Sequence, residues 1–411
     1  VAFVVFNLMQ CRRLASESAA VRRRRPRQRP GGDGRRALEG SHEEEKVEYG
    51  AGASKACQEL WTAKWSCAWG ASGERRPGKV HWHPWVGREG RGGAMVVQCP
   101  TPRAGSPAVS AAAAGAADGG ILLGVSAADA EGETLYEREN ILVCHEGFDK
   151  PLDLAACTMV ANIADTHLLL RSWVQYHLFL GVECILVYID EADNDFARQI
   201  LQDFLRTGQV RLVNFWFPRV SSIRNWRTQL AQDYHCLYWA RGRARWVASF
   251  DIDEYFQLTG GNRTIPEFLA HLTRADVAAV QTRSAFWTFN SSDELAAAKR
   301  RPGFPCSTVA CRELYEPGKD GRPKIAHMQP DDYYFPSFIR AKLIINPENT
   351  VYFDVHRVAV GLKPVYKPSP TTELRLNHVQ LRRSPEVCSP GVGVEDTSFR
   401  DSEACRALSR S

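Results

Sequence analysis

Short apolar, β-branched runs alternate with helical segments between residues 155 and 256, and this alternation limits the possible folds more than any other feature of the sequence. The four runs read CTMVANI, CILVYID, QVRLVNFWF and RWVASF, and they begin at residues 157, 184, 209 and 245. Runs of this length and composition, bounded by helical segments, predict strands that are buried on both faces of a sheet.

The segments between these runs have the period of an α-helix. The first segment places four apolar side chains on one helix face: Leu169, Trp173, Tyr176 and Leu180. Gly181 ends this helix, and further helices are predicted over residues 195–207 and 225–241. Strands that are joined by helices at this spacing form right-handed crossovers. The predicted fold class is therefore α/β, with a mostly parallel central sheet.

Three carboxylates follow the fourth run directly in the stretch WVASFDIDEYF, namely Asp251, Asp253 and Glu254. In an extended chain the first two would point to the same side, where two ionised carboxylates repel each other unless a cation lies between them. Mn²⁺ or Mg²⁺ prefers such oxygen ligands and keeps positions open for phosphate, so the pattern predicts a metal–diphosphate site. An acidic turn after a strand is the alternative, and the pattern by itself favours neither.

A further acid, Asp190, closes the second run. Open α/β sheets bind ligands beyond the carboxyl ends of their strands, and Asp190 and Asp251 both lie just past such ends. We therefore expect Asp190 to contact the ribose or base of a nucleotide whose metal-bound diphosphate lies at Asp251 and Asp253. A turn residue that opens DEADND explains Asp190 equally well.

Composition divides the chain into three parts. Residues 1–140 carry the Arg-rich run VRRRRPRQRPGGDGRR and many scattered Gly and Pro, so we expect a mostly disordered region without a core. Residues 154–383 form the predicted globular domain, and residues 384–411 form a C-terminal tail. The net charge of +5 is small for 411 residues and no nucleic-acid motif accompanies the Arg run, so no nucleic-acid partner is expected.

The opening stretch, the cysteines and two sequons bear on the cellular compartment. VAFVVFNLMQ would suit the end of a truncated membrane anchor, and membrane contact is expected only through this segment. Cys306 and Cys311 could close a small disulfide loop in a secretory lumen, and buried free thiols explain them equally well. Asn262 and Asn290 begin the sequons NRT and NSS, which permit N-glycosylation.

Five segments resemble glycosyltransferase family 92, which belongs to the GT-A, family 2-like group. They are RSWVQYHLFLGVECILVYIDEADND, HCLYWARGRARWVASFDIDEYF, FWTFNSS, IRAKLIINPENTVYFDVH and LRLNHVQLR, in this order. The resemblance implies a GT-A fold and an inverting transfer of a hexose from a UDP-sugar to a glycan or glycoprotein acceptor. It also implies UDP-galactose as the donor of characterised members, Mn²⁺ as the cofactor, and residence in the Golgi membrane or the secretory lumen.

The resemblance assigns roles to individual residues. Asp251 and Asp253 match the metal motif, and His378 in RLNHV matches a histidine that completes the metal shell. Lys342 and His356 match positions that would meet the charge of the nucleotide diphosphate. A structural hydrogen bond is the alternative for His378, and a solvated edge position is the alternative for Lys342.

Several positions depart from the family pattern. Asp165 and Thr166 stand near the place of an acidic N-E pair, Asn290 replaces a glycine, and Val379 replaces a tyrosine. These departures keep a second class of function open, that of a non-enzymatic carbohydrate-binding protein.

Inverting transfer requires a carboxylate that takes a proton from the acceptor hydroxyl. The segments after FWTFNSS offer five candidates: Asp293, Glu294, Glu313, Asp331 and Asp332. Glu313 is the first choice because of its order along the chain.

Overall fold

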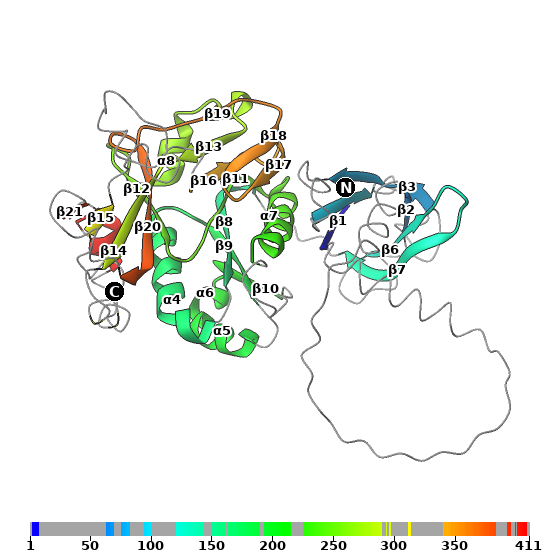
Figure 1. Ribbon diagram of the computed structural model, residues 1–411, viewed down its shortest axis with the longest axis horizontal. Coiled ribbons are helices and arrows are strands. Elements are labelled where there is room, and N and C mark those ends of the chain that lie inside the picture. Colours follow the sequence, from blue (N-terminus) through cyan, green and yellow to red (C-terminus); the bar gives the residue numbers. More distant parts are fainter. Residues whose placement is uncertain are drawn as a thin grey trace, which may run out of the picture. The chain divides into compact units, whose positions relative to one another are not determined.

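The computed structural model describes residues 2–7, 63–69, 75–82, 94–99, 121–143, 150–160, 163–189, 193–214, 225–289, 293, 296, 311–313, 340–383, 393–395, 399 and 401–408. The chain forms two compact units, Val1–Glu146 and Gly147–Ser411 (Figure 1). All residues that the sequence proposes for the site belong to the second unit.

The first unit is built from β-strands. They are β1 (Ala2–Asn7), β2 (Lys64–Trp69), β3 (Arg75–Pro77), β4 (Lys79–Trp82), β5 (Ala94–Cys99), β6 (Ile121–Ala128) and β7 (Thr134–Val143). They form two sheets, in the orders β1-β5-β4 and β3-β2-β6-β7. Trp65, Leu123 and Val125 belong to the buried core of this unit, and a disulfide between Cys67 and Cys99 joins the two sheets.

These strands differ from the expectation of a mostly disordered region without a core. Five of these seven strands have six residues or fewer, so their alternating patterns do not extend over a long window. Lys64–Trp69 alternates between more and less buried side chains, but over only six residues. The apolar opening stretch forms β1, and no helix among the described residues is long and apolar enough to cross a membrane. The Arg-rich run lies outside those residues.

The second unit contains a seven-stranded sheet in the order β10-β9-β8-β11-β16-β13-β19. Its strands are β8 (Leu152–Val160), β9 (Cys184–Ile189), β10 (Val210–Asn214), β11 (Ala244–Ser249), β13 (Ala279–Thr282), β16 (Lys342–Ile345) and β19 (Val365–Tyr366). The helices are α4 (Ile163–Phe179), α5 (Asn194–Ile200), α6 (Gln202–Arg206), α7 (Asn225–Ala240), α8 (Ile265–Ala270) and the 3₁₀ turn Arg274–Asp276. The second predicted helix is divided at Leu201 into α5 and α6.

The central sheet is mixed, whereas the sequence predicted a mostly parallel one. The strands β10, β9, β8 and β11 pair in parallel, as their helical crossovers require. The next strand, β16, pairs antiparallel with both β11 and β13. The alternating pattern ended at β11, so it carried no information on the direction of the later strands.

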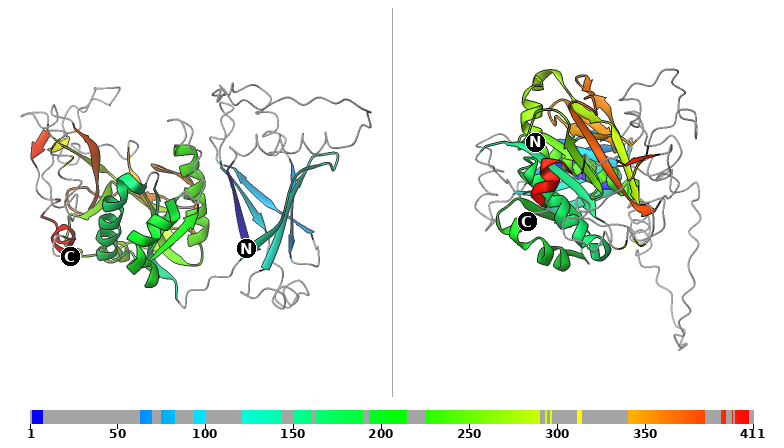
Figure 2. Two further views of the ribbon diagram at one scale, coloured as in Figure 1. Left: turned by 90° about the horizontal axis from the view of Figure 1, so that it is seen from below. Right: turned by 90° about the vertical axis from the view of Figure 1, so that its left-hand side faces the viewer.

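Both faces of this sheet are buried, and successive side chains of each strand alternate between them. Leu154 and Ile185 belong to a core cluster that includes side chains of α4 and α5. Their neighbours Ala155 and Leu186 belong to a second cluster that includes side chains of α7. Figure 2 shows α4 and α7 on opposite sides of the sheet.

A second sheet has the order β12-β20-β14-β15-β21. Its strands are β12 (Glu254–Leu258), β14 (Ser284–Phe289), β15 (Cys311–Glu313), β20 (Leu374–Arg383) and β21 (Gly393–Glu395), and β17 (Thr350–Asp354) pairs separately with β18 (Arg357–Gly361). Two side chains of α4 bind β12: Trp173 Nε1 donates to Glu254 O at 2.9 Å, and Tyr176 Oη donates to Phe256 O at 2.7 Å. Helix α4 therefore connects the two sheets.

The described residues after 383 contribute to the core, whereas the sequence suggested a tail. Phe399 is buried, and its ring centroid lies 6.0 Å from that of Tyr176 and 5.7 Å from that of Tyr255. Helix α10 (Glu403–Leu408) packs against α4. These apolar side chains are spaced too widely along the chain to form a periodic pattern.

Candidate active site

The three acids after β11 lie where the chain passes from the central sheet to the second sheet. β11 ends at Ser249 in the central sheet, and Glu254 begins β12 in the second sheet. The Glu254 N–H donates to Asp251 O at 3.1 Å, and the Asp251 N–H donates to Glu254 Oε2 at 2.8 Å. The chain therefore forms a turn here. The prediction that Asp251 and Asp253 point to the same side assumed an extended chain. Asp251 and Asp253 have different partners.

A lysine supplies the cation between two of these acids. Lys342, the first residue of β16, is 1% exposed, and its Nζ lies 2.8 Å from Asp251 Oδ2 and 3.2 Å from Glu254 Oε2. The side chain of Glu254 is 2% exposed and that of Asp251 is 40% exposed. Gln229 Nε2 donates to the other oxygen of Asp251 at 3.0 Å. Asp251 is thus held at both oxygens by the protein while part of it stays open to solvent.

Burial and contact shift the pKa values of this group. Burial opposes the charge of Lys342, but Asp251 and Glu254 outweigh it and raise the lysine's pKa. Burial acts to raise the pKa of Asp251, but the ammonium of Lys342 outweighs it and lowers that pKa. Burial raises the pKa of Glu254 to about 7, although Lys342 acts against this shift. The lysine therefore keeps Asp251 ionised, while burial lets Glu254 take up a proton near neutral pH.

His378 on β20 faces the remaining acid. Its Nε2 lies 3.3 Å from Asp253 Oδ2, and its side chain is 15% exposed where that of Asp253 is 25% exposed. Burial acts to lower the pKa of His378, but the hydrogen bond with Asp253 and the charge of Glu254 raise it. The ring of Phe286 packs beside the imidazole, with the centroids 4.9 Å apart. The Val379 N–H donates to Asp253 O at 2.8 Å, so β20 holds both the backbone and the side chain of Asp253.

One cross-strand row of the second sheet brings together residues from four strands. Glu254 of β12 pairs with His378 of β20, His378 pairs with Phe286 of β14, and Phe286 pairs with Glu313 of β15. Figure 1 shows these strands side by side. Neighbouring strands lie about 4.8 Å apart, so the backbone of Glu313 is about 10 Å from that of His378.

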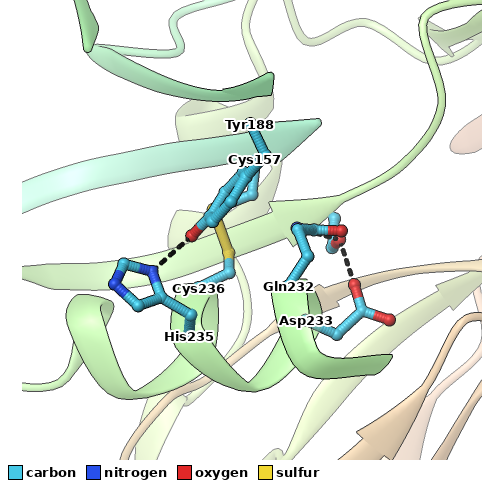
Figure 3. Close-up of a disulfide and its surroundings, with 7 residues drawn as sticks. Cys157, Tyr188, Gln232, Asp233, His235 and Cys236 are labelled. Carbon is cyan, nitrogen blue, oxygen red and sulfur yellow. Dashed lines mark hydrogen bonds between the residues drawn. A yellow bond between two sulfur atoms is a disulfide. The ribbon is translucent and has the colours of Figure 1, made fainter. Parts of the chain in front are cut away.

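Helix α7, which carries Gln229, is fixed to the central sheet by a disulfide (Figure 3). Cys236 of α7 is bonded to Cys157 of β8, and both residues are fully buried. Beside this bond, Tyr188 Oη and His235 Nδ1 form a hydrogen bond of 2.7 Å. Burial lowers the pKa of His235 to about 4, so this ring is neutral at physiological pH.

Polar residues of α7 also hold the end of β11. Ser249 Oγ donates to Asp233 Oδ1 at 2.5 Å, and Gln232 Nε2 donates to Ser249 Oγ at 3.4 Å. Burial raises the pKa of Asp233 to about 7. Gln229, Gln232 and Asp233 were not among the residues predicted from the sequence. Their i, i+3, i+4 spacing puts them on one face of the helix, and polar residues on the face of a helix that packs on a sheet were the available signal.

His356 adjoins this network, since its charge acts to lower the pKa of Asp251. His356 Nδ1 forms a hydrogen bond of 2.8 Å with the carbonyl of Ala341, and burial lowers the pKa of His356. Asp293 is exposed, and only the backbone of Glu313 is described. Six residues named in the sequence analysis lie outside the described ranges: Asp190, Asn290, Glu294, Cys306, Asp331 and Asp332.

The geometry of Asp253 and His378 suits a divalent metal. Two ligands at right angles on Mg²⁺ lie about 3 Å apart, and here Asp253 Oδ2 and His378 Nε2 are 3.3 Å apart. Asp251 differs because Lys342 and Gln229 already bind its oxygens. Among the described residues, no three His, Cys, Asp or Glu side chains are grouped as a metal site would require. The described residues therefore offer two ligands, which would leave positions open for phosphate oxygens.

Comparison with known proteins assigns the chain to a family. The sequence model of glycosyltransferase family 92 matches residues 153–397. Family 92 proteins of Ricinus communis and Arabidopsis thaliana are each 31% identical to this chain, over 113 and 104 residues. These matches cover 28% and 25% of this chain and 18% and 16% of those proteins. A family 92 protein of Oryza sativa subsp. japonica is 26% identical over 163 residues, which are 39% of this chain and 26% of that protein.

The chain thus matches only about a quarter or less of the length of these curated relatives. The family match, in contrast, covers more than half of the chain and runs from β8 through β21. It includes Asp251, Asp253, Lys342 and His378. This chain belongs to glycosyltransferase family 92.

Proposed function

We propose that this chain is an inverting, metal-dependent glycosyltransferase with a GT-A fold, which moves a hexose from a UDP-sugar to a glycan or glycoprotein acceptor. The proposal rests on one observation: the acids that follow β11 have different partners. Lys342 neutralises the buried side of this group, and Asp253 and His378 remain as a facing pair that is partly open to solvent. UDP-galactose is the first donor to test, because the family resemblance implies it.

Asp253 Oδ2 and His378 Nε2 would hold the metal ion, Mn²⁺ or Mg²⁺. When bound, the ion supplies Lewis-acid stabilisation of the negative charge on the departing diphosphate. Asp251 is ionised and 40% exposed, so it can accept a hydrogen bond from a ribose hydroxyl. Asp190 and His356 remain proposed nucleotide contacts. Lys342 acts on the nucleotide through Asp251, because its own ammonium is sealed between two carboxylates.

The transfer itself is a displacement at the anomeric carbon of the hexose. The acceptor hydroxyl oxygen forms a bond to this carbon, the bond from the carbon to the UDP oxygen breaks, and UDP leaves with the electron pair. The hydroxyl proton goes to a carboxylate. Glu313 is the first candidate for this base, since its backbone lies in the same cross-strand row as His378.

We also propose that the protein works in the secretory pathway, in the Golgi membrane or the lumen. Support comes from the disulfides Cys67–Cys99 and Cys157–Cys236, because disulfides persist in oxidising compartments. Membrane attachment through the N-terminal region and the absence of a nucleic-acid partner are part of the same proposal.

The test is a screen of UDP-sugars with and without Mn²⁺, followed by two variants. Asp253→Asn should weaken Mn²⁺-dependent UDP binding at least tenfold and nearly abolish transfer, because a neutral amide replaces an ionised ligand. Its melting temperature without metal should change little, since Asn keeps the shape of the side chain. Glu313→Gln should lower kcat and leave UDP affinity unchanged.

Asp203→Asn is the matched control, since its side chain is 62% exposed on α6. Unchanged UDP affinity in a folded Asp253→Asn protein would remove the nucleotide–metal site from the proposal. Glycan binding without transfer from any UDP-sugar would instead support the non-enzymatic carbohydrate-binding alternative.

A further inference from the structure

The loop between β12 and α8 presents one of the two sequons in an open setting. Gly261 and Arg263 are exposed, and a Cβ added to Gly261 would meet no atom within 4 Å. Between them, Asn262 is partly exposed, and its Oδ1 lies 3.2 Å from Nε2 of the exposed His271. Within the described part of the chain, the amide nitrogen Nδ2 of Asn262 has no hydrogen bond, so this atom is available for modification.

We propose that Asn262 is an N-glycan acceptor. In the modification, Nδ2 forms a bond to the anomeric carbon of a lipid-diphosphate-linked oligosaccharide, and the bond from that carbon to the diphosphate oxygen breaks. The lipid diphosphate leaves with the electron pair, and Nδ2 gives one proton to a base of the transferring enzyme. The carbonyl oxygen Oδ1 keeps its lone pairs, so its contact with His271 persists in the glycosylated protein.

The disulfides provide independent support from outside the loop. Cys67–Cys99 lies in the first unit and Cys157–Cys236 in the second, and all four cysteines are buried. Disulfides of this kind form in the oxidising secretory lumen, and sequons are used on the surfaces of secreted proteins. The inference therefore does not depend on the proposed sugar transfer.

The loop also lies at the far end of β12 from the candidate active site. The acids precede Glu254 at the start of this strand, and the loop follows Leu258 at its end. A strand rises about 3.4 Å per residue, so the two ends are about 14 Å apart. A glycan on Asn262 should therefore leave UDP binding unchanged.

Thr264 has two roles, which the test must separate. It completes the sequon, and it is the N-cap of α8, where its Oγ1 accepts the Glu267 N–H at 3.3 Å. Thr264→Ser keeps both the sequon and the capping oxygen. Thr264→Asp removes the sequon, but its carboxylate still caps the helix because Asp and Ser are similarly good N-cap residues.

The experiment expresses the full chain behind a secretory signal peptide in eukaryotic cells. The peptide that contains Asn262 is measured by mass spectrometry before and after treatment with an amidase that removes N-glycans and leaves Asp. We expect glycosylation of this peptide in the parent chain and in Thr264→Ser. We expect none in Asn262→Gln or Thr264→Asp, with the melting temperature of Thr264→Asp close to that of the enzymatically deglycosylated parent.

An unmodified Asn262 peptide in a parent chain whose signal peptide has been removed would overturn the proposal. Occupancy at Asn290 in the same digest shows entry into the lumen independently of Asn262. Mn²⁺-dependent UDP binding by the same preparations reports separately on the proposed function, so the two proposals can fail independently.

Discussion

Replacement of Lys342 by Met would remove the cation between two carboxylates while keeping a flexible apolar stem. Loss of one partner of a buried ion pair costs about 3–5 kcal/mol. Glu254, at 2% exposed, should bear most of this cost, and the contact with Asp251, at 40% exposed, adds little because solvent screens it. Burial already raises the pKa of Glu254 to about 7, so proton uptake limits the loss. We expect the free energy of unfolding to fall by about 3 kcal/mol.

Urea and thermal unfolding of Lys342→Met, Glu254→Gln and the double variant measure this effect. A loss of about 3 kcal/mol corresponds to roughly 6–12 °C in melting temperature for a domain of this size. Glu254→Gln in the Lys342→Met background should recover at least half of the loss, because no unpaired buried carboxylate remains. Arg206→Met is the control, since its side chain is 77% exposed and its pair with Asp203 spans 3.5 Å. This control should not change the stability measurably.

Three results would refute the reasoning about Lys342. A stability change below about 1 kcal/mol in Lys342→Met would mean that the ammonium is not the counter-ion of Glu254. A large loss of UDP affinity in a variant of normal stability would show that Lys342 contacts the diphosphate directly, as the family resemblance implied. Additive effects of Lys342→Met and Glu254→Gln would contradict their coupling.

Two further predictions concern helix α7. Replacing both Cys157 and Cys236 by Ala should lower the free energy of unfolding by about 4 kcal/mol, because the bond joins residues separated by 79 positions. Urea unfolding against the oxidised parent chain measures this loss, and a loss below about 1 kcal/mol would contradict it. Asp233→Asn should flatten the dependence of stability on pH. The folded pKa of about 7 lies above the ordinary 3.8, so the protonated carboxyl's contribution is complete below about pH 4 and is lost as the pH rises through about 7. Unfolding at pH 5 and pH 8 tests this, and equal pH slopes in the parent and the variant would rule it out.

The strands β8 to β11 and the helices between them could be predicted because their patterns are local. Cys184–Ile189 is a continuous apolar run that is buried along its whole length. Helix α4, which precedes it, has buried Leu169, Trp173 and Tyr176 on one face, as the helical period predicted. The direction of β16 could not be predicted in this way. It depends on pairing with β11, about a hundred residues earlier, and no local pattern records that choice.

The same difference between local and long-range information applies to the candidate site. The acids themselves are a local pattern, so Asp251 and Asp253 could be named from the sequence. Their partners are not local: Lys342 meets Asp251 across 91 positions, and His378 reaches Asp253 through the register of β20 on β12. Family resemblance named Lys342 and His378. Geometry was needed to find that Lys342 pairs with the acids and that Gln229 supports Asp251.

The pairing of β20 with β12 limits how the length of this gene can change during evolution. One residue inserted or deleted between Leu374 and His378 would bring Asn377 or Val379 opposite Glu254 and remove the imidazole from Asp253. Such an indel acts like the loss of the histidine itself, although it alters no residue of the site. Length variation among functional homologues should therefore occur in the segment between β19 and β20, at residues 367–373, and should be absent from the strand.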